Sequence, residues 1–430
     1  YNYAEALAKS MLFYEAQRSG TLPSDQRVPW RSDSGLSDGA DNNIDLAGGY
    51  YDGAGYIKYN FPMAFSTTLL SWGVIRYKRT YEALGQLDYV LDTIKWTTDY
   101  FIKCHPEPDV FYGQVSDNAA DSQYFGRPED MNYQRRSYKI DFSNSGTDLA
   151  AEAAATMASA AIVFRSSNPS YAATLQQHAV ELYDFATNAP RRSYKLSIQP
   201  AAQAYGSSGF QDELAWAAAW LFKASKNKLY QNRARRHHVV SSTEFSWDVK
   251  TAGVQLMLDD FDKQDLYPRV ATFCNWMLDS GPRTADGLLH LNSAYPAKYA
   301  ANAAFILMLA YEKFPRAARA TEWRALGIKQ INYLLGDNRK GQSFVVGFGD
   351  QPPTQPLHKG SSCPLPPAEC GREFREVNSP NPNVLYGALV GGPNEMDDFS
   401  DLRTLEDQSS VSLDGNAGFQ AAVAGVIHLK

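Results

Sequence analysis

The sequence predicts an all-α fold in which helical hairpins close into a barrel. Apolar residues recur with the helical period in roughly a dozen segments, whereas strand signals are few and short, such as Ser343–Phe348. This pattern suits six hairpins in an (α/α)6 barrel as well as an open α-solenoid, but the absence of a fixed-length repeat disfavours the solenoid. No change in composition marks a linker, so residues 1–430 are predicted to form a single domain.

The expected helices are recognised by their apolar spacing and by the residues that end them. Gly20 and Pro23 follow the first segment closely, which is a common signal for a helix C-terminus. Alanine-rich stretches, such as 150–161 and 215–219, would let neighbouring helices approach closely. The clearest segments are Tyr3–Gln17, Met63–Lys78, Leu84–Cys104, Thr147–Arg165, Tyr171–Asn188, Asp212–Ala224, Lys250–Phe261, Leu266–Leu278, Lys298–Phe314, Thr321–Leu335 and Asn416–Leu429.

Composition and charge exclude several classes of protein. An apolar content of 44% with 20% charged residues fits a well-buried globular chain. A formal net charge of −6 argues against nucleic acid or an anionic membrane as the partner. The longest apolar stretch, around 300–310, is too short to cross a bilayer. The chain begins at Tyr1 without a visible signal peptide, which favours a processed, secreted protein over a cytoplasmic one that would start with Met.

The four cysteines are too few for a disulfide scaffold. Cys363 and Cys370 flank a Pro-rich loop and could close a small disulfide, while Cys104 and Cys274 lie in helical patterns and are expected to be free and buried. No Cys-x-x-Cys or paired-histidine spacing predicts a zinc site. The adjacent residues at 237 and 238 are both histidine, but neighbours on a helix point to different faces.

Two short motifs near the ends of the chain resemble the halves of one active site. The first is Gly48-Gly49-Tyr50-Tyr51-Asp52-Gly53-Ala54-Gly55, and the second runs from Phe399-Ser400-Asp401 through Ser410 to Asn416-Ala417-Gly418. Both resemble the catalytic segments of family 9 glycoside hydrolases, the inverting β-1,4-endoglucanases. Longer matches continue the resemblance from end to end, at 10–20, 125–131, 212–221, 301–305 and 387–393. The resemblance implies an (α/α)6 barrel with an open cleft for a β-glucan chain.

Each motif lacks the residue that performs the chemistry in that family. The family's catalytic base, an aspartate, corresponds to Gly55, and its general acid, a glutamate, corresponds to Ser410. Asp52 matches the first aspartate, which helps to hold the nucleophilic water. An inverting glycosidase needs two carboxyl groups about 6.5–9.5 Å apart, and neither glycine nor serine supplies one. The resemblance with these two changes predicts a pseudoenzyme that binds β-glucan, or serves in structure or assembly, without hydrolysing it.

Two other functions are open. One is a weakly active endoglucanase that uses Asp52 with a displaced Glu406 or Asp407. The register set by residues 399–401 and 416–417 instead leaves both acids in a solvated charge run. The other function is a protein-interaction scaffold that binds another protein and has no role with carbohydrate.

The resemblance also implies a set of sugar contacts. Aromatic rings can stack on sugar faces while their hydroxyls bond to sugar hydroxyls. Phe125 stands where the family has a stacking tryptophan, and Leu357 and Lys359 stand where it has a histidine and an arginine. The expected substrate contacts are Tyr51, Tyr124, Phe125, Arg127, Tyr205, His358 and Lys359.

A structural Ca²⁺ ion is the remaining feature that the resemblance implies; no organic cofactor is expected. Calcium takes six to eight oxygen ligands. Ser208, Gly209, Asp212 and Glu213 match the family's calcium loop, and Asp248 is a further candidate ligand. The alternative is that Asp212 and Glu213 only stabilise the N-terminus of the helix that follows them.

Overall fold

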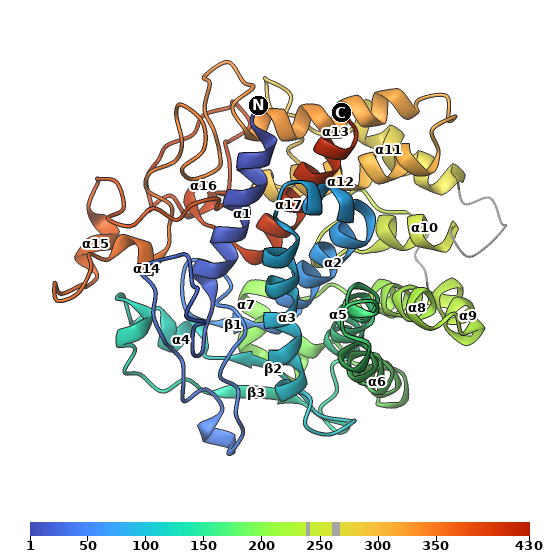
Figure 1. Cartoon of the computed structure of the whole chain (residues 1–430), viewed down its shortest axis with the longest axis horizontal. Helices are drawn as coiled ribbons and strands as arrows, with labels where there is room; N and C mark the ends of the chain where they lie inside the picture. Colours follow the sequence, from blue (N-terminus) through green and yellow to red (C-terminus); the bar gives the residue numbers. More distant parts are fainter. Residues whose placement is uncertain (238–240, 260–266) are drawn as a thin grey trace.

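The computed structural model describes residues 1–237, 241–259 and 267–430, and its helices form the predicted (α/α)6 barrel (Figure 1). Among these residues, an inner ring of helices closes on itself, each helix contacting the next. The inner helices are α2 (Asn60–Ala83), α5 (Thr147–Phe164), α8 (Gln211–Ser225), α10 (Thr251–Asp259), α12 (Pro296–Lys313) and α17 (Leu413–His428). The outer helices are α1 (Tyr3–Gln17), α3 (Leu87–Cys104), α6 (Pro169–Asn188), α9 (Lys228–His237), α11 (Tyr267–Asp279) and α13 (Ala320–Leu334).

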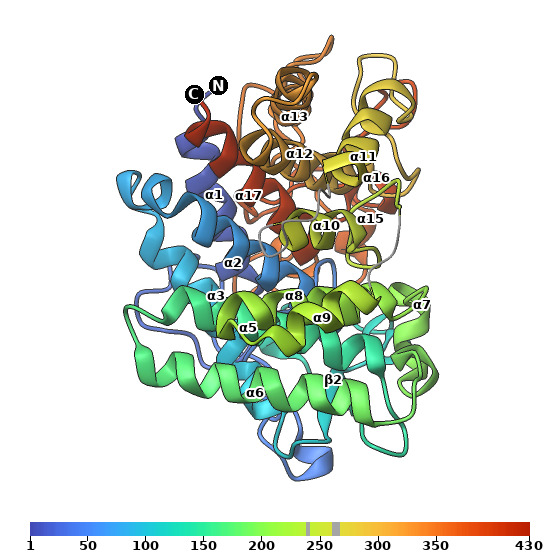
Figure 2. The same ribbon diagram turned by 90° about the vertical axis from the view of Figure 1, so that its right-hand side faces the viewer.

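Small and aromatic side chains explain why the inner helices fit together. Almost every residue of α5 is buried, and its alanines allow close contact with α6 on the outside and α8 beside it (Figure 2). Trp216 and Trp220 lie one turn apart on α8, with ring centroids 5.5 Å from each other. Both rings pack against Trp72 of α2, whose centroid lies 5.4 Å from that of Phe305 on α12. Four aromatic rings from three helices therefore fill the barrel interior.

One small sheet accompanies the barrel. Strands β1 (Lys58–Tyr59), β2 (Phe111–Val115) and β3 (Ser137–Ile140) pair antiparallel in that order. The expected strand Ser343–Phe348 is wrong, because this segment forms a single isolated bridge, between Val345 and Leu389. Short helices connect the remaining segments: α4 (Asn118–Asp121), α7 (Ala202–Tyr205), α14 (Lys359–Ser362), α15 (Glu373–Glu376) and α16 (Glu406–Ser409).

Helix boundaries differ from the sequence prediction by a few residues. The helix expected from Met63 extends from Asn60 to Ala83, and α3 begins only at Leu87, since Gly85 adopts a positive φ of 63° and makes the turn between them. The last helix starts at Leu413, where Ser412 caps it by accepting a hydrogen bond from Gly415 N. Residues 238, 261 and 266, which belong to the histidine pair and to two expected helix ends, lie outside the described residues.

The first and last helices pack together and complete the ring. Figures 1 and 2 both place the two chain ends side by side. The Lys430 ammonium donates to the Tyr3 hydroxyl over 3.0 Å. At the other end of α1, the Tyr14 hydroxyl donates to the Leu413 carbonyl over 2.8 Å. The C-terminal segment is thereby fixed against the N-terminal one.

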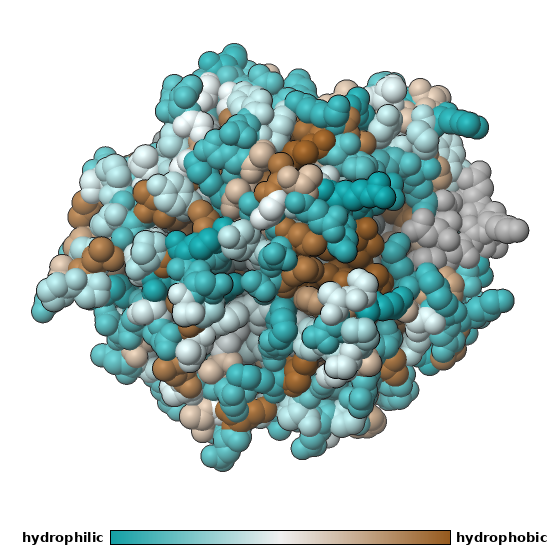
Figure 3. Space-filling model, in the orientation of Figure 1, coloured by the Kyte–Doolittle hydropathy of each residue, from teal (hydrophilic) through white to brown (hydrophobic). Residues whose placement is uncertain are grey.

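The surface contrasts with the apolar interior. The face drawn in Figure 3 is mostly hydrophilic, and its apolar residues gather mainly in a patch near the centre of the view. Within the described residues, α5 is long and apolar enough to cross a membrane by length and composition, but 89% of that stretch is buried inside the protein. Its apolar side chains therefore contact other helices.

Candidate functional site

A cleft of about 700 Å³ brings the two sequence motifs together. It lies beside the N-terminal ends of α12 and α17 and is lined by loops from distant parts of the chain. Asp52, Gly55 and Ser410 all line it. A bridge between Gly53 and Ser412 holds the two motifs in register.

Asp52 lies on the cleft in an environment that favours its protonated form. Its Oδ2 accepts a hydrogen bond of 2.6 Å from the Tyr205 hydroxyl, and its buried Oδ1 has no partner among the described residues. Burial, reinforced by the nearby negative charge of Asp414, raises the pKa of Asp52 to about 7. Asp52 can therefore exchange a proton near neutral pH.

An ion pair fills the space that a side chain at position 55 would need. A Cβ atom on Gly55 would lie 2.1 Å from Oδ2 of Asp121. Asp121 is fixed there because Oδ2 accepts from the Lys359 ammonium over 2.6 Å and Oδ1 accepts from Tyr56 N over 2.9 Å. The Tyr133 hydroxyl also donates to Oδ1, over 3.1 Å. The position of the family's base is thus occupied by a carboxylate from the end of α4, which is paired with a lysine.

The position of the family's acid lies on the same cleft without a carboxyl group. Ser410 follows α16 and is bridged to Leu357. Glu406 lines the cleft, but its Oε1 accepts from Arg375 over 2.9 Å and its side chain is 58% exposed. Asp407 is exposed and does not line the cleft. Neither acid has the apolar pocket that lets a general acid keep its proton near neutral pH.

Aromatic rings form one wall of the cleft. Tyr205, Tyr124, Phe125 and Lys359, four of the expected sugar contacts, line it. Tyr205 packs between Tyr59 and Trp247, at ring-centroid distances of 5.2 and 5.0 Å.

Several cleft residues were not predicted from the sequence. Tyr59 and Trp247 belong to the same wall, and the sequence around each is uninformative: Tyr59 lies in a two-residue strand, and Trp247 lies in a loop directly before Asp248. Asp121 and Lys298 line the cleft as well, with no local pattern that marks them.

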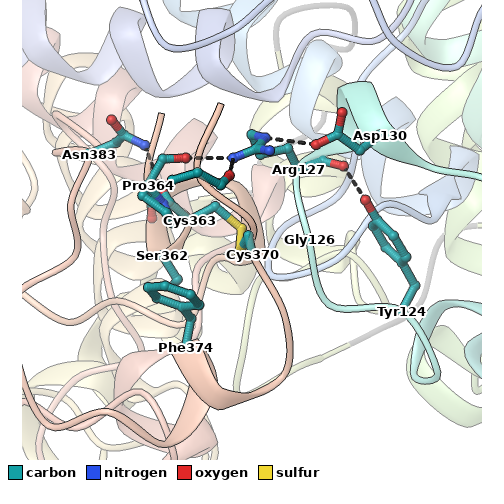
Figure 4. The surroundings of a disulfide bond; sticks show 12 residues. Tyr124, Gly126, Arg127, Asp130, Ser362, Cys363, Pro364, Cys370, Phe374 and Asn383 are labelled. Carbon is teal, nitrogen blue, oxygen red and sulfur yellow. Dashed lines mark hydrogen bonds and ion pairs between the residues drawn. A yellow bond between two sulfur atoms is a disulfide. The ribbon is translucent and has the colours of Figure 1, made fainter. Parts of the chain in front are cut away.

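Two predicted sugar contacts are corrected by the structure, because they serve the scaffold. Tyr51 is buried to 1% exposure, does not line the cleft, and donates its hydroxyl to Ser34 Oγ over 2.9 Å. The Arg127 guanidinium donates to Asp130 and to the carbonyls of Pro364 and Ala368 (Figure 4). These two carbonyls lie in the loop closed by the Cys363–Cys370 disulfide, so Arg127 anchors that loop. Cys104 and Cys274 are free and buried, as predicted.

The third correction is His358, which supports the Asp52 loop from behind. Its Nδ1 accepts from Ser361 N over 2.9 Å, so the ring proton must be on Nε2, which donates to Gln17 Oε1 over 2.7 Å. The Gln17 amide in turn donates to the carbonyls of Tyr51 and Gly53. His358 is buried and does not line the cleft, so it positions the motif without contacting a ligand.

The burial of His358 predicts a loss of stability in acid. Burial lowers the pKa of His358 to about 3 in the folded protein, against 6.5 for an exposed histidine. Between these values the unfolded chain binds a proton that the folded chain does not, so this contribution to stability is present above pH 6.5 and declines as the pH falls. The decline is about 1.4 kcal/mol per pH unit, or roughly 2 kcal/mol between pH 6.5 and 5.

Urea unfolding of the parent and His358→Gln at several pH values measures this contribution. The free energy of unfolding of the parent should fall more steeply below pH 6.5 than that of the variant. Parallel curves would show that His358 is protonated in the folded state.

Among the predicted calcium ligands, Glu213 shares one oxygen with a lysine ammonium. Lys250 Nζ donates to Glu213 Oε1 over 2.9 Å and lies 3.4 Å from Glu152 Oε2, all in the protein interior. Glu213 Oε2 has no hydrogen-bond partner among the described residues.

The other four candidates lie near one another at the start of α8. Asp248 Oδ1 accepts from Ser208 N, and Asp212 Oδ2 accepts from Lys250 N, each over 2.7 Å. The Gly209 carbonyl accepts from Ser207 Oγ. Each aspartate therefore has one carboxylate oxygen left for a cation. A calcium ion takes six to eight oxygen ligands, so water would have to supply several of them. A calcium ion held by Ser208, Gly209, Asp212, Glu213 and Asp248 stays a prediction.

Comparisons with known proteins agree on one family. The family model for glycosyl hydrolase family 9 matches residues 3–423. Endoglucanase 2 of Oryza sativa subsp. japonica is 40% identical, over 99% of this chain and 73% of that protein. The structure of an endoglucanase from the termite Nasutitermes takasagoensis superposes with a TM-score of 0.96 and 44% identity, covering 100% of this chain and 99% of the other. Cellulase Cel9M of C. cellulolyticum in complex with cellobiose gives a TM-score of 0.92 at 28% identity, covering 100% and 99%.

Proposed function

Because the chain belongs to glycosyl hydrolase family 9, we propose that its cleft binds a β-1,4-glucan chain without hydrolysing it. The observation that carries this proposal is that the carboxyl groups of Asp121, Glu406 and Asp52 along the described cleft each have a hydrogen-bond or ion-pair partner. Asp121 is paired with Lys359, Glu406 with Arg375, and Asp52 with the Tyr205 hydroxyl. Position 55, which would supply the base, holds glycine, and position 410, which would supply the acid, holds serine. Hydrolysis by inversion needs two opposed carboxyl groups with a water between them.

Binding of glucan is supported by the aromatic wall. Tyr205, Phe125, Tyr59 and Trp247 present rings to the cleft, and polar groups lie beside them. A sugar ring has apolar faces and a polar rim, which suit this combination. A solved family member holds cellobiose, which supports a cello-oligosaccharide as the ligand.

Two assays test binding and hydrolysis separately. In native gels that contain β-glucan, we expect the protein to be retarded and Tyr205→Ala to lose that retardation, because the variant removes the central ring of the wall. Tyr205→Phe is the matched control, which keeps the ring and removes only the hydroxyl that contacts Asp52. Reducing-sugar release from carboxymethyl cellulose should stay at the background level.

The outcomes distinguish the alternatives. Clear turnover would establish an active endoglucanase. Absence of both retardation and turnover would favour a scaffold that binds another protein.

Residual hydrolysis through Asp52 is the second candidate function, favoured by one observation. Its pKa of about 7 lies in the range that suits a proton donor or acceptor at neutral pH. If slow release of reducing sugar is detected, Asp52→Asn should abolish it. Release that survives this substitution would assign the activity elsewhere.

We also propose that the protein is secreted. The disulfide between Cys363 and Cys370 supports this location, because disulfides persist mainly in oxidising compartments. This proposal is tested by comparing the amount of the protein in the culture medium with the amount in the lysate of the cells that produce it.

A further inference from the structure

Two histidines and a glutamate meet on the outside of the barrel, away from the cleft. His105 directly follows α3, whereas His178 and Glu181 lie three residues apart on one face of α6. The candidate ligand atoms of the three side chains all lie within 4.8 Å of one another, and His105 Nδ1 is 2.7 Å from His178 Nδ1. None of the three lines the cleft. Their juxtaposition has no part in the proposed glucan binding.

The hydrogen bonds around His105 assign which ring nitrogen carries a lone pair. The Pro108 carbonyl lies 3.2 Å from His105 Nε2, and a carbonyl can only accept, so Nε2 carries the proton. Nδ1 of a neutral His105 therefore presents its lone pair to His178. An imidazole whose second nitrogen donates to a backbone carbonyl is the arrangement that orients histidine ligands in metal sites.

The surroundings of the two rings supply negative charge. Glu181 acts electrostatically on both rings, Asp109 acts on His105, and each supplies negative charge. Gln177 donates only to Oε1 of Glu181, which leaves Oε2 for another partner.

We propose that His105 Nδ1, His178 Nδ1 and the Glu181 carboxylate bind one divalent transition-metal ion of the Zn²⁺ class. Two imidazole nitrogens and one carboxylate suit zinc, whereas calcium takes oxygen ligands. With Zn–N bonds of about 2.05 Å at tetrahedral angles, the two Nδ1 atoms would stand about 3.3 Å apart, so His178 must move outward by roughly 0.6 Å. His178 and Glu181 are only partly buried, which allows this movement and leaves a path for the ion.

Metal binding replaces the hydrogen bond between the two histidines. In the metal-free protein the proton between the rings belongs to His178 Nδ1, because His105 Nδ1 accepts it. When the ion binds, that proton leaves Nδ1 and the neutral ring carries its proton on Nε2. The ion then ties the end of α3 to the middle of α6, two outer helices that belong to different hairpins.

Titration of the whole, chelator-stripped protein with Zn²⁺ alone, followed by calorimetry, tests the proposal. We expect one zinc ion per chain and a rise in the thermal unfolding midpoint with zinc concentration. Co²⁺ in place of zinc should give visible absorption bands with nitrogen ligands. His178→Ala should weaken zinc binding by more than about 100-fold, since it removes a direct ligand and outer partners alone account for 10–100-fold.

Matched variants make the result decisive. Glu181→Gln keeps the size and hydrogen bonding of the side chain and should also weaken binding, which protects the test if His178→Ala fails to fold. His237→Ala, on α9, is the control and should bind zinc as the parent does, because this ring hydrogen-bonds to Gln211 and does not belong to the three-residue cluster. Failure of the parent to bind one zinc, or equal binding by Glu181→Gln and the parent, would overturn the proposal. Neither outcome bears on glucan binding.

Discussion

Gly55→Asp combined with Ser410→Glu should create endoglucanase activity in this protein. The two substitutions place carboxyl groups at the positions of the family's base and acid, and each such group contributes about 10²–10⁴ in rate. The new aspartate must displace the Asp121 carboxylate, whose Oδ2 lies 2.1 Å from the position of the added Cβ. This movement is feasible because the obstacle is the end of a side chain, and Lys359 can pair with either carboxylate.

The measurement is reducing-sugar release from carboxymethyl cellulose. The matched control is Gly55→Asn with Ser410→Gln, which adds nearly the same volumes without carboxyl groups. We expect the acidic variant to exceed the amide variant by at least about 10²-fold. Equal rates in two folded variants would show that the other changes in the cleft, such as Leu357 and Lys359, are as limiting as the missing acids.

Lys250→Met should cost about 3–5 kcal/mol of folding free energy, the usual result of removing one member of a buried ion pair. Lys250 is fully buried and contacts Glu213 and Glu152. Methionine replaces the length of the side chain but leaves both carboxyl groups without a cation. Whole domains are stable by only about 5–15 kcal/mol, so this single change should be visible in any unfolding experiment.

The pH dependence identifies the cause of that cost. Burial raises the pKa of Glu152 to about 7 and that of Glu213 well above its ordinary value, even beside Lys250. A raised folded-state pKa gives stability that is present below the unfolded value and lost as the pH rises through the folded value. Removal of the Lys250 ammonium should raise both carboxyl pKa values further, so the variant loses more stability than the parent as the pH rises. The penalty of Lys250→Met should therefore be larger at pH 8 than at pH 6, when measured by urea unfolding.

Lys78→Met is the control, because its pair with Glu82 is half exposed and contributes at most about 0.5 kcal/mol. A penalty of similar size in both variants, or one independent of pH, would contradict the assignment.

The helices were predictable from the sequence because their signals are local. The apolar period, the alanine-rich stretches and the residues that end helices all lie within a few turns of each other. Strand Ser343–Phe348 was wrong because its apolar residues pack into the core from an irregular segment. The sheet of β1, β2 and β3 was missed because its strands have two to five residues, too few to show alternation.

The features of the site that local sequence motifs mark were also predictable, whereas those that depend on contacts between distant residues were not. The motifs around Asp52, Gly55 and Ser410 were predicted to meet, and they line one cleft. The role of Asp121 could not be predicted, because it depends on a contact between residues 55 and 121 that no spacing in the sequence encodes. Likewise, Glu213 matched a calcium loop locally, while the cation that it contacts comes from Lys250, 37 residues later. His105 and His178 are 73 residues apart, which is why histidine spacing gave no sign of their contact.

The bridge between Gly53 and Ser412 has a consequence for how the protein is made. These two residues are 359 positions apart, since 412 minus 53 is 359, and Asp52 lies directly beside the first of them. At 5–20 residues per second, a ribosome needs roughly 20–70 s to add the second residue after the first. During that interval the nascent chain can form its early hairpins, but the side of the cleft that residues 410–415 supply does not yet exist. The cleft around Asp52 is therefore complete only after those residues have been added.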